Sequence, residues 1–172
     1  REYQIPFLGI CLGMQLSIIE FAKNVLKIKN AGSSEFGKYK NNLISLMTEW
    51  NFQNKKIKRT KDTDLGATMR LGSYPCHIKA KSLASKIYKN KLIKERHRHR
   101  YEVNPKFRLQ LEKKGLIFSG FSKDKKLLEI IENENHKWFL GVQFHPELKS
   151  KPFKPHPIFL SFIKNSLDYK NE

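Results

Sequence analysis

The sequence predicts an α/β fold in which an open, mostly parallel sheet is flanked by helices and carries antiparallel additions. The run Ile5–Ile10 is apolar enough for a buried parallel strand, and apolar residues recur at helical spacing from Leu12 onward. Short β-rich runs fill the C-terminal third, and apolar positions in 158–167 predict a closing amphipathic helix. This order of strand, helix, several strands and helix is typical of an α/β domain.

The other elements are predicted from apolar patterns and turn residues. Residues 30–42 are rich in Gly, Ser, Asn and Lys and predict a long surface loop, a kind of segment that tends to be functional. Ser82 is placed to cap a short helix that runs through Tyr88. The predicted strands are 43–47, a hairpin over 50–59, 74–78, an extended segment 95–103 ended by Asn104-Pro105, 116–121, 127–132 and 139–144.

Length and charge limit the function classes. The 172 residues, 39% of them hydrophobic, are enough for one domain with a sizeable core. The net charge is +18, but the lysines are spread along the chain without a nucleic-acid-binding motif, so we expect no nucleic-acid partner. The chain has no signal-peptide pattern and no membrane-length apolar run, and two cysteines make no disulfide framework. We therefore expect no membrane partner and a reducing, cytoplasmic location.

Cys11 lies between Gly9 and Gly13, where the first strand gives way to the first helix. This arrangement is typical of a nucleophile elbow, a sharp turn that presents a reactive side chain. The helix N-terminus favours a thiolate, and both glycines leave room for the turn and for close packing. The alternative is a small buried core residue, because free cysteine is among the most buried residue types.

His145 and Glu147 follow the last predicted strand directly. Two residues apart on an extended segment, their side chains emerge on the same side, and Pro146 stiffens the backbone between them. A cysteine nucleophile needs a base and a group that orients the base, and these two residues suit those roles. Parallel strands that end side by side would bring them to Cys11 at the carboxyl edge of the sheet. The alternative is an ordinary surface histidine.

The run Glu95–Asn104 contains three arginines and two histidines. His97 and His99 share one face of the predicted strand and could be metal ligands, whereas the arginines could form a phosphate site. No other ligand cluster accompanies either possibility. In the loop over 30–42, Glu35 is a candidate site residue, with a solvated surface charge as the alternative.

The segments Pro6–Gln15 and Gln143–Glu147 together resemble the class I, triad-type glutamine amidotransferases, whose sheet is flavodoxin-like. Within that class, Glu95–Asn104 and Thr68–Gly72 are similar to the glutaminase domain of the CTP synthases. The cysteine elbow and the His-Pro-Glu element are shared by the whole class, whereas the arginine-histidine run is more specific. The similarity extends from about Ile5 to Phe162.

The resemblance implies a role for each matching residue. Cys11 attacks the side-chain amide of L-glutamine, His145 shuttles the proton, and Glu147 orients the histidine. A free amino acid presents an ammonium and a carboxylate, so one acidic and one planar cationic partner suit the pocket. The implied glutamine contacts are Leu12, Gly13, Met14, Gln15, Glu35 and Arg100.

The resemblance also implies partners. Ammonia would pass to a synthetase domain of the same polypeptide, which aminates UTP activated by ATP, with Mg²⁺ on the nucleotides and GTP as a stimulator. No cofactor and no metal is assigned to any residue here, and the intact protein would form a homotetramer. Alternatives are an amidotransferase subunit of another synthetase, a glutamyl hydrolase, or a non-catalytic fragment that acts as a binding module.

The chain begins ten residues before Cys11, so we expect residues 1–172 to be a partial glutaminase domain. The synthetase domain and the first part of the glutaminase domain would be absent. In the resembled family, that first part supplies the second donor of the oxyanion hole, and the amide of Leu12 supplies only one. We therefore expect the isolated chain to have little glutaminase activity.

Overall fold

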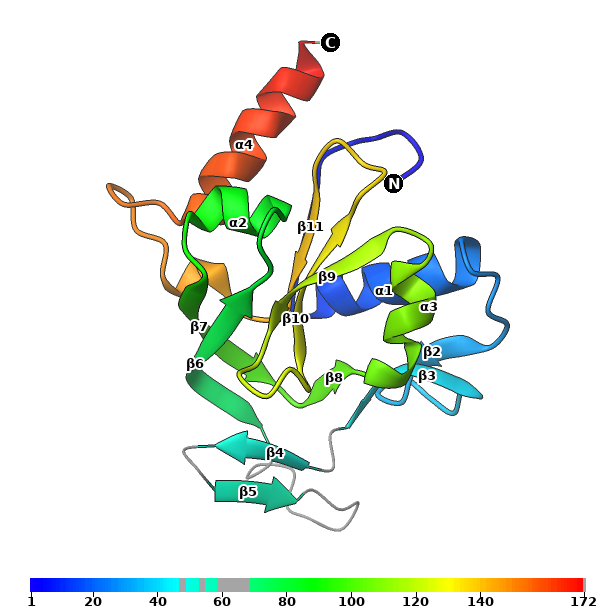
Figure 1. Cartoon of the computed structure of the whole chain (residues 1–172). Helices are drawn as coiled ribbons and strands as arrows, with labels where there is room; N and C mark the ends of the chain where they lie inside the picture. Colours follow the sequence, from blue (N-terminus) through cyan, green and yellow to red (C-terminus); the bar gives the residue numbers. More distant parts are fainter. Residues whose placement is uncertain (47–48, 53–54, 59–68, 172) are drawn as a thin grey trace.

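The computed structural model describes residues 1–46, 49–52, 55–58 and 69–171. A central six-stranded sheet organises this part of the chain, with the strand order β1-β11-β10-β9-β6-β7 (Figure 1). Its strands are β1 (Phe7–Ile10), β6 (Arg70–Ile78), β7 (Leu92–His99), β9 (Leu116–Phe121), β10 (Leu128–Asn133) and β11 (Phe139–Val142). The α/β class is therefore confirmed.

The central sheet is mixed, with more antiparallel pairing than the sequence predicts. β1 pairs in parallel with β11, whereas the pairs β11–β10, β10–β9, β9–β6 and β6–β7 in the described sheet are antiparallel. The turns at 122–127 and 134–138 are short, and short connections join antiparallel neighbours. The expected antiparallel additions thus make up most of the described sheet.

Helices cover both faces of the central sheet. α1 (Leu12–Asn24) and α3 (Arg108–Glu112) lie on one face, whereas α2 (Leu83–Tyr88) and α4 (Pro157–Lys170) pack together on the other (Figure 1). Two buried clusters follow from strand alternation, since the neighbours Ile130 and Ile131 point to opposite faces. Ser82 caps α2 as predicted, accepting a hydrogen bond from the Ser85 amide at 3.0 Å.

Two smaller sheets accompany the central one. The first contains β2 (Ala31–Ser33), β3 (Asn41–Leu46) and β8 (Tyr101–Val103). The second is the predicted hairpin, with β4 (Glu49–Phe52) and β5 (Lys55–Lys58). The prediction of a loop over 30–42 is wrong at its start, because Ala31–Ser33 form a buried strand that pairs with β3. Two short 3-10 helices, η2 (Pro105–Phe107) and η3 (Pro146–Leu148), complete the described elements.

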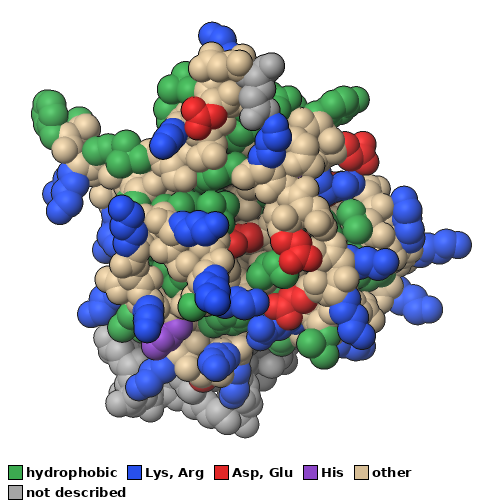
Figure 2. Space-filling model, turned by 45° about the horizontal axis from the view of Figure 1, so that its top comes forward, with side chains coloured by type: hydrophobic (Ala, Val, Ile, Leu, Met, Phe, Trp, Pro, Cys, Tyr) green, Lys and Arg blue, Asp and Glu red, His purple; other side chains and the backbone are tan. Residues whose placement is uncertain are grey.

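Lysine and arginine side chains are spread over the face of the molecule in Figure 2 and do not gather in one basic patch. Acidic and apolar side chains are interspersed among them. In the described part of the chain, no helix has the length and apolar character that crossing a membrane requires.

Candidate active site

Cys11 lies in the sharp turn between β1 and α1. Its backbone has φ 51° and ψ −102°, a region that residues other than glycine rarely adopt. Its amide donates a hydrogen bond of 2.7 Å to the carbonyl of Val142 at the end of β11, and its carbonyl accepts one of 3.2 Å from the amide of Gln15. The predicted strained turn is therefore confirmed, and β11 holds it in place.

Gly9 lets β1 approach α1 closely. A Cβ atom at Gly9 would lie 2.8 Å from the backbone carbon of Gly13 and 2.9 Å from the backbone nitrogen of Met14. A Cβ at Gly13 would meet no atom within 4 Å. The prediction that a missing side chain allows close packing is therefore correct for Gly9. It is wrong for Gly13, because a side chain would fit there, and only the backbone of Gly13 contacts Gly9.

His145 and Glu147 form the predicted pair. The Nδ1 atom of His145 lies 2.5 Å from Oε1 of Glu147, and the amide of His145 donates a hydrogen bond of 2.8 Å to the carbonyl of Arg96 on β7. The backbone differs from the expected extended form, because η3 begins at Pro146 and the turn brings Glu147 back toward His145.

The carboxylate partner determines the tautomer of His145. A carboxylate only accepts hydrogen bonds, so Nδ1 of a neutral His145 carries the hydrogen and Nε2 presents its lone pair. That Nε2 atom is buried and makes no hydrogen bond within the described part of the chain. It is therefore available to accept a proton.

Burial disfavours the thiolate form of Cys11. Burial raises the pKa of the Cys11 thiol to about 11. A hydrogen bond from the Leu12 amide lowers this pKa, but by less than burial raises it. Glu102 and Glu147 raise it further, whereas a hydrogen bond from Gln143 lowers it. The Leu12 amide at the helix N-terminus favours the thiolate, as expected, but the loss of solvation outweighs this contribution. Nucleophilic attack by Cys11 consequently needs a base.

Gln143 contacts Cys11 directly, a contact that the sequence does not predict. Its side chain is buried, and its Nε2 lies 3.6 Å from Sγ of Cys11. Its Oε1 accepts a hydrogen bond of 3.1 Å from Nε2 of Gln15, which also donates one of 3.0 Å to the carbonyl of Tyr101. A polar residue between an apolar strand and His145 is the signal that could have identified Gln143.

The other residues implied as glutamine contacts have different exposures. Leu12 is 43% exposed and Gly13 borders open space, whereas the side chains of Met14 and Gln15 are buried. Among the four, the amide group of Gln15 is already bonded to Tyr101 and Gln143. A direct contact from Met14 or Gln15 to a substrate would therefore involve the backbone. The roles of all four as contacts stay predictions.

Glu35 and Arg100 lie in separate connections. Glu35 is exposed in the turn after β2, where its amide donates a hydrogen bond of 3.2 Å to Oγ of Ser33. Arg100 is half-buried in the connection between β7 and β8. It directly precedes Tyr101, whose carbonyl is bonded to Gln15. The roles of Glu35 and Arg100 as contacts stay predictions.

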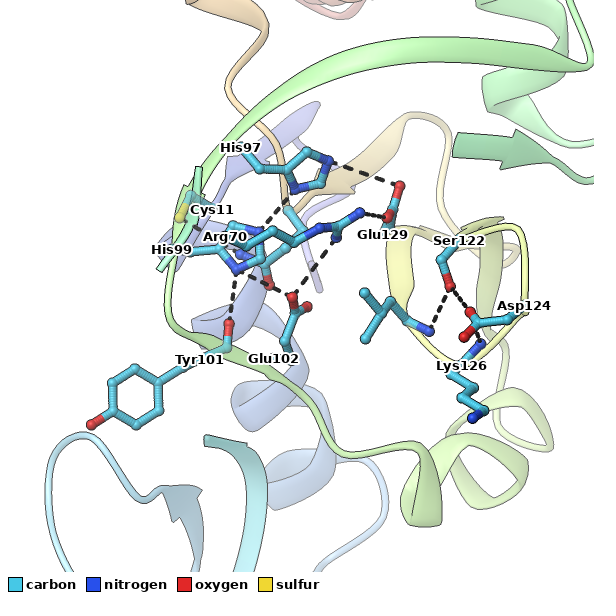
Figure 3. A network of polar contacts seen from close by, with 12 residues as sticks. Cys11, Arg70, His97, His99, Tyr101, Glu102, Ser122, Asp124, Lys126 and Glu129 are labelled. Carbon is cyan, nitrogen blue, oxygen red and sulfur yellow. Dashed lines mark hydrogen bonds and ion pairs between the residues drawn. The ribbon is translucent and has the colours of Figure 1, made fainter. Parts of the chain in front are cut away.

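Buried polar side chains of β7 lie beside the elbow (Figure 3). Nδ1 of His97 lies 2.8 Å from Nε2 of His99, and Nδ1 of His99 lies 3.1 Å from the carbonyl of Tyr101. Between these histidines and Glu129 in Figure 3, Arg70 forms an ion pair with Glu129. The predicted shared face of the two histidines is confirmed. Besides each other and the backbone, they face buried carboxylates, with His97 3.9 Å from Glu129 and His99 3.5 Å from Glu102.

This bonding bears on the metal alternative. The carbonyl of Tyr101 only accepts, so Nδ1 of His99 carries a hydrogen and donates it there. Burial lowers the pKa of His97, so this histidine is neutral. In the described part of the chain, no group of three or more His, Cys, Asp or Glu side chains is placed to hold a metal ion.

Glu95 anchors the segment that carries His145. Its buried carboxylate accepts a hydrogen bond of 3.1 Å from the hydroxyl of Tyr88 and lies 3.0 Å from Nε2 of His156, the N-cap of α4. Nζ of Lys149, directly after η3, lies 3.3 Å from the same carboxylate. The arginine-histidine run therefore also supports the fold around η3 and α4.

Comparisons with known proteins agree with this architecture. The profile of the family "Glutamine amidotransferase class-I" matches residues 1–165. A putative GMP synthase subunit from Thermoplasma acidophilum aligns over 96% of this chain and 59% of its own, with a TM-score of 0.57 and 15% identity, which indicates a shared fold alone. The chain belongs to the class I glutamine amidotransferase family.

More similar relatives are CTP synthases. The enzyme of Pelagibacter ubique is 64% identical over 170 residues, and that of Hyphomonas neptunium is 56% identical over 163 residues. These alignments cover 99% and 95% of this chain but only 31% and 30% of the relatives. The glutaminase domain of the Trypanosoma brucei enzyme, solved with bound acivicin, aligns over 98% of this chain and 62% of its own, with a TM-score of 0.86 and 35% identity. Within its family, the chain is a glutaminase domain of the CTP synthase type.

Proposed function

We propose that Cys11, His145 and Glu147 catalyse the hydrolysis of L-glutamine to glutamate and ammonia. The observation that carries the proposal is the hydrogen bond that ties the Cys11 turn to Val142, the last residue of β11. The His145–Glu147 pair begins three residues after Val142. The carboxylate fixes the histidine tautomer, so a lone pair at Nε2 is available to a thiol.

The first half of the reaction forms a thioester. Nε2 of His145 takes the Cys11 proton as sulfur attacks the side-chain carbonyl carbon of glutamine. The Leu12 amide at the start of α1 donates a hydrogen bond to the resulting oxyanion. His145 then returns the proton to the departing nitrogen, the carbon–nitrogen bond breaks, and ammonia leaves.

The second half restores the enzyme. A water molecule attacks the thioester carbon and gives a proton to His145, which passes it to the departing sulfur. Glutamate leaves and the Cys11 thiol is regenerated. The sum is glutamine plus water giving glutamic acid plus ammonia, and the proton lost by the new carboxyl group converts ammonia to ammonium, so the atoms and charges balance without a cofactor.

We propose that the residues implied by the family resemblance bind glutamine. Arg100 grips the carboxylate of the amino acid, and Glu35 takes its ammonium group. Leu12 is exposed and Gly13 half-buried in the first helical turn, and we propose that their backbone and that of Met14 and Gln15 contact the substrate. The acivicin held by the Trypanosoma brucei domain supports a ligand site in this fold.

The proposed wider activity is that of the CTP synthases. The ammonia is passed to a synthetase domain of the same polypeptide, where it aminates UTP with ATP as the activating nucleotide. ATP, Mg²⁺ and the stimulator GTP are assigned to no residue of this chain, which spans about 31% of the length of the Pelagibacter relative. The whole protein is proposed to be a cytoplasmic homotetramer.

Glutamate release from glutamine, measured in a polypeptide that joins this chain to the first part of the glutaminase domain, tests the catalytic assignment. Cys11→Ala should abolish it, and His145→Ala should lower the rate by about 10²–10⁴-fold through loss of the acid and base. In a polypeptide that joins this chain to a synthetase, Cys11→Ala should abolish CTP formation from glutamine and preserve formation from added ammonium. Glutamate release that survives Cys11→Ala would contradict the assignment.

A further inference from the structure

We propose that Gln143, held by Gln15, is a positioning residue that orients the sulfur of Cys11 and stabilises its thiolate. The inference rests on the proposed function, since it gives the nucleophile a third supporting group besides His145 and the Leu12 amide. We name the arrangement of Gln15 and Gln143 the glutamine relay.

The orientation of both side-chain amides in the glutamine relay follows from their partners. The carbonyl of Tyr101 can only accept a hydrogen bond, so the group of Gln15 that lies 3.0 Å from it is the NH₂. The same NH₂ faces the side chain of Gln143 at 3.1 Å, which must therefore present its oxygen there. The NH₂ of Gln143 is left to point at Sγ of Cys11, at 3.6 Å.

Burial makes this donor effective. Gln143 has no exposed surface and Gln15 is 3% exposed, so water does not compete for their amide groups. A hydrogen bond donated to sulfur favours the thiolate over the thiol, and it lowers the pKa of Cys11 against the effect of burial. Gln143 thus opposes the desolvation that makes Cys11 a poor nucleophile at rest.

The backbone fixes the same geometry. Val142, the residue before Gln143, accepts the hydrogen bond from the amide of Cys11 at 2.7 Å, and the amide of Gln143 donates one of 2.9 Å to the carbonyl of Glu129 on β10. The Tyr101 carbonyl also accepts from His99, so the relay begins at a backbone group that β7 holds in place. The relay is therefore part of the framework that also aligns the elbow with β11.

The test measures the rate at which iodoacetamide alkylates Cys11 near pH 8, resolved from Cys76 by peptide mass spectrometry. Because the thiolate is the reacting form, the rate reports the stability of the thiolate without requiring glutamine. Gln143→Met keeps the shape and removes the donor, so we expect about a tenfold lower rate, equivalent to about one pKa unit. Gln15→Met should slow the reaction less, because it only releases Gln143.

The double variant separates a relay from two independent effects. If Gln15 acts through Gln143, the double variant should react no more slowly than Gln143→Met alone. Ser119→Ala is the matched control, because the Ser119 hydroxyl is fully buried, has no hydrogen-bond partner within the described residues and lies on β9. It should leave the rate unchanged.

An unchanged rate in a folded Gln143→Met would overturn the proposal, and so would slowing in the double variant equal to the product of the single effects. If Gln143→Met does not fold, Gln15→Met carries the test, and an unchanged rate there overturns the relay. A different result would show that the proposed function fails: Cys11 of the wild-type protein would react with iodoacetamide but not with a glutamine analogue.

Discussion

The contact between Gly9 and the first turn of α1 predicts that Gly9→Ala destabilises the protein. The added Cβ would lie 2.8 and 2.9 Å from the carbonyl carbon and oxygen of Gly13 and 2.9 Å from the Met14 nitrogen. All three atoms are backbone, so no side chain can rotate away. Reaching an ordinary contact of 3.4 Å from 2.8 Å requires β1 and α1 to separate by 0.6 Å at this point. Overpacking of this kind costs about 1–3 kcal/mol, of which the lower entropy of the unfolded alanine chain offsets about 0.5 kcal/mol.

Urea unfolding followed by circular dichroism measures this cost, with Gly13→Ala as the matched control. A Cβ at Gly13 meets nothing within 4 Å, and alanine is favoured over glycine in a helix by about 0.5–1 kcal/mol. The two substitutions, four residues apart, should therefore shift the free energy of unfolding in opposite directions. Equal shifts, or a Gly9→Ala variant as stable as the wild type, would refute the packing argument.

Two further predictions concern buried charged or titratable groups. The Glu132 carboxylate accepts hydrogen bonds of 2.8 Å from each of the first two amides of α2, so Glu132→Gln should lower the free energy of unfolding by about 1 kcal/mol. The exposed Glu134→Gln is the control, and equal effects of the two would contradict the capping role. Burial lowers the pKa of His97, so the unfolded chain binds a proton below about pH 6.5 that the folded chain does not. The stability that this group contributes is present above that pH, and the free energy of unfolding should fall by about 1.4 kcal/mol between pH 7.5 and 5.5. His97→Gln should reduce this pH dependence, and an unchanged pH dependence in the variant would contradict the prediction.

Local patterns predicted the elements that carry the chemistry. The glycines that mark the turn at Cys11 lie within two positions of it, and the His145–Glu147 contact spans only two residues. The parallel pairing of β1 with β11 was expected from two apolar runs that each precede a candidate site residue, and the structure confirms it. Such information is present in short stretches of sequence, so it can be read before the fold is known.

Long-range contacts determined what the sequence could not reveal. The partners of Gln143 in the relay, Gln15 and Cys11, lie 128 and 132 positions away along the chain. The local sequence therefore marks a polar residue before His145 but does not reveal its partners or its orientation. The pKa of Cys11 depends on how completely the folded chain removes water, which outweighs the helix N-terminus that the sequence does show. The mixed sheet likewise follows from which strands become neighbours.

The central claim is that Cys11 is the glutamine-directed nucleophile of this chain. The most direct test is the intact mass after exposure to the diazoketone analogue of glutamine, with Cys11→Ala as the control and peptide mapping to locate the adduct. The account predicts one adduct, confined to Cys11 and lost in Cys11→Ala, while the buried Cys76 stays unmodified. No adduct, or equal labelling of Cys76, would contradict it.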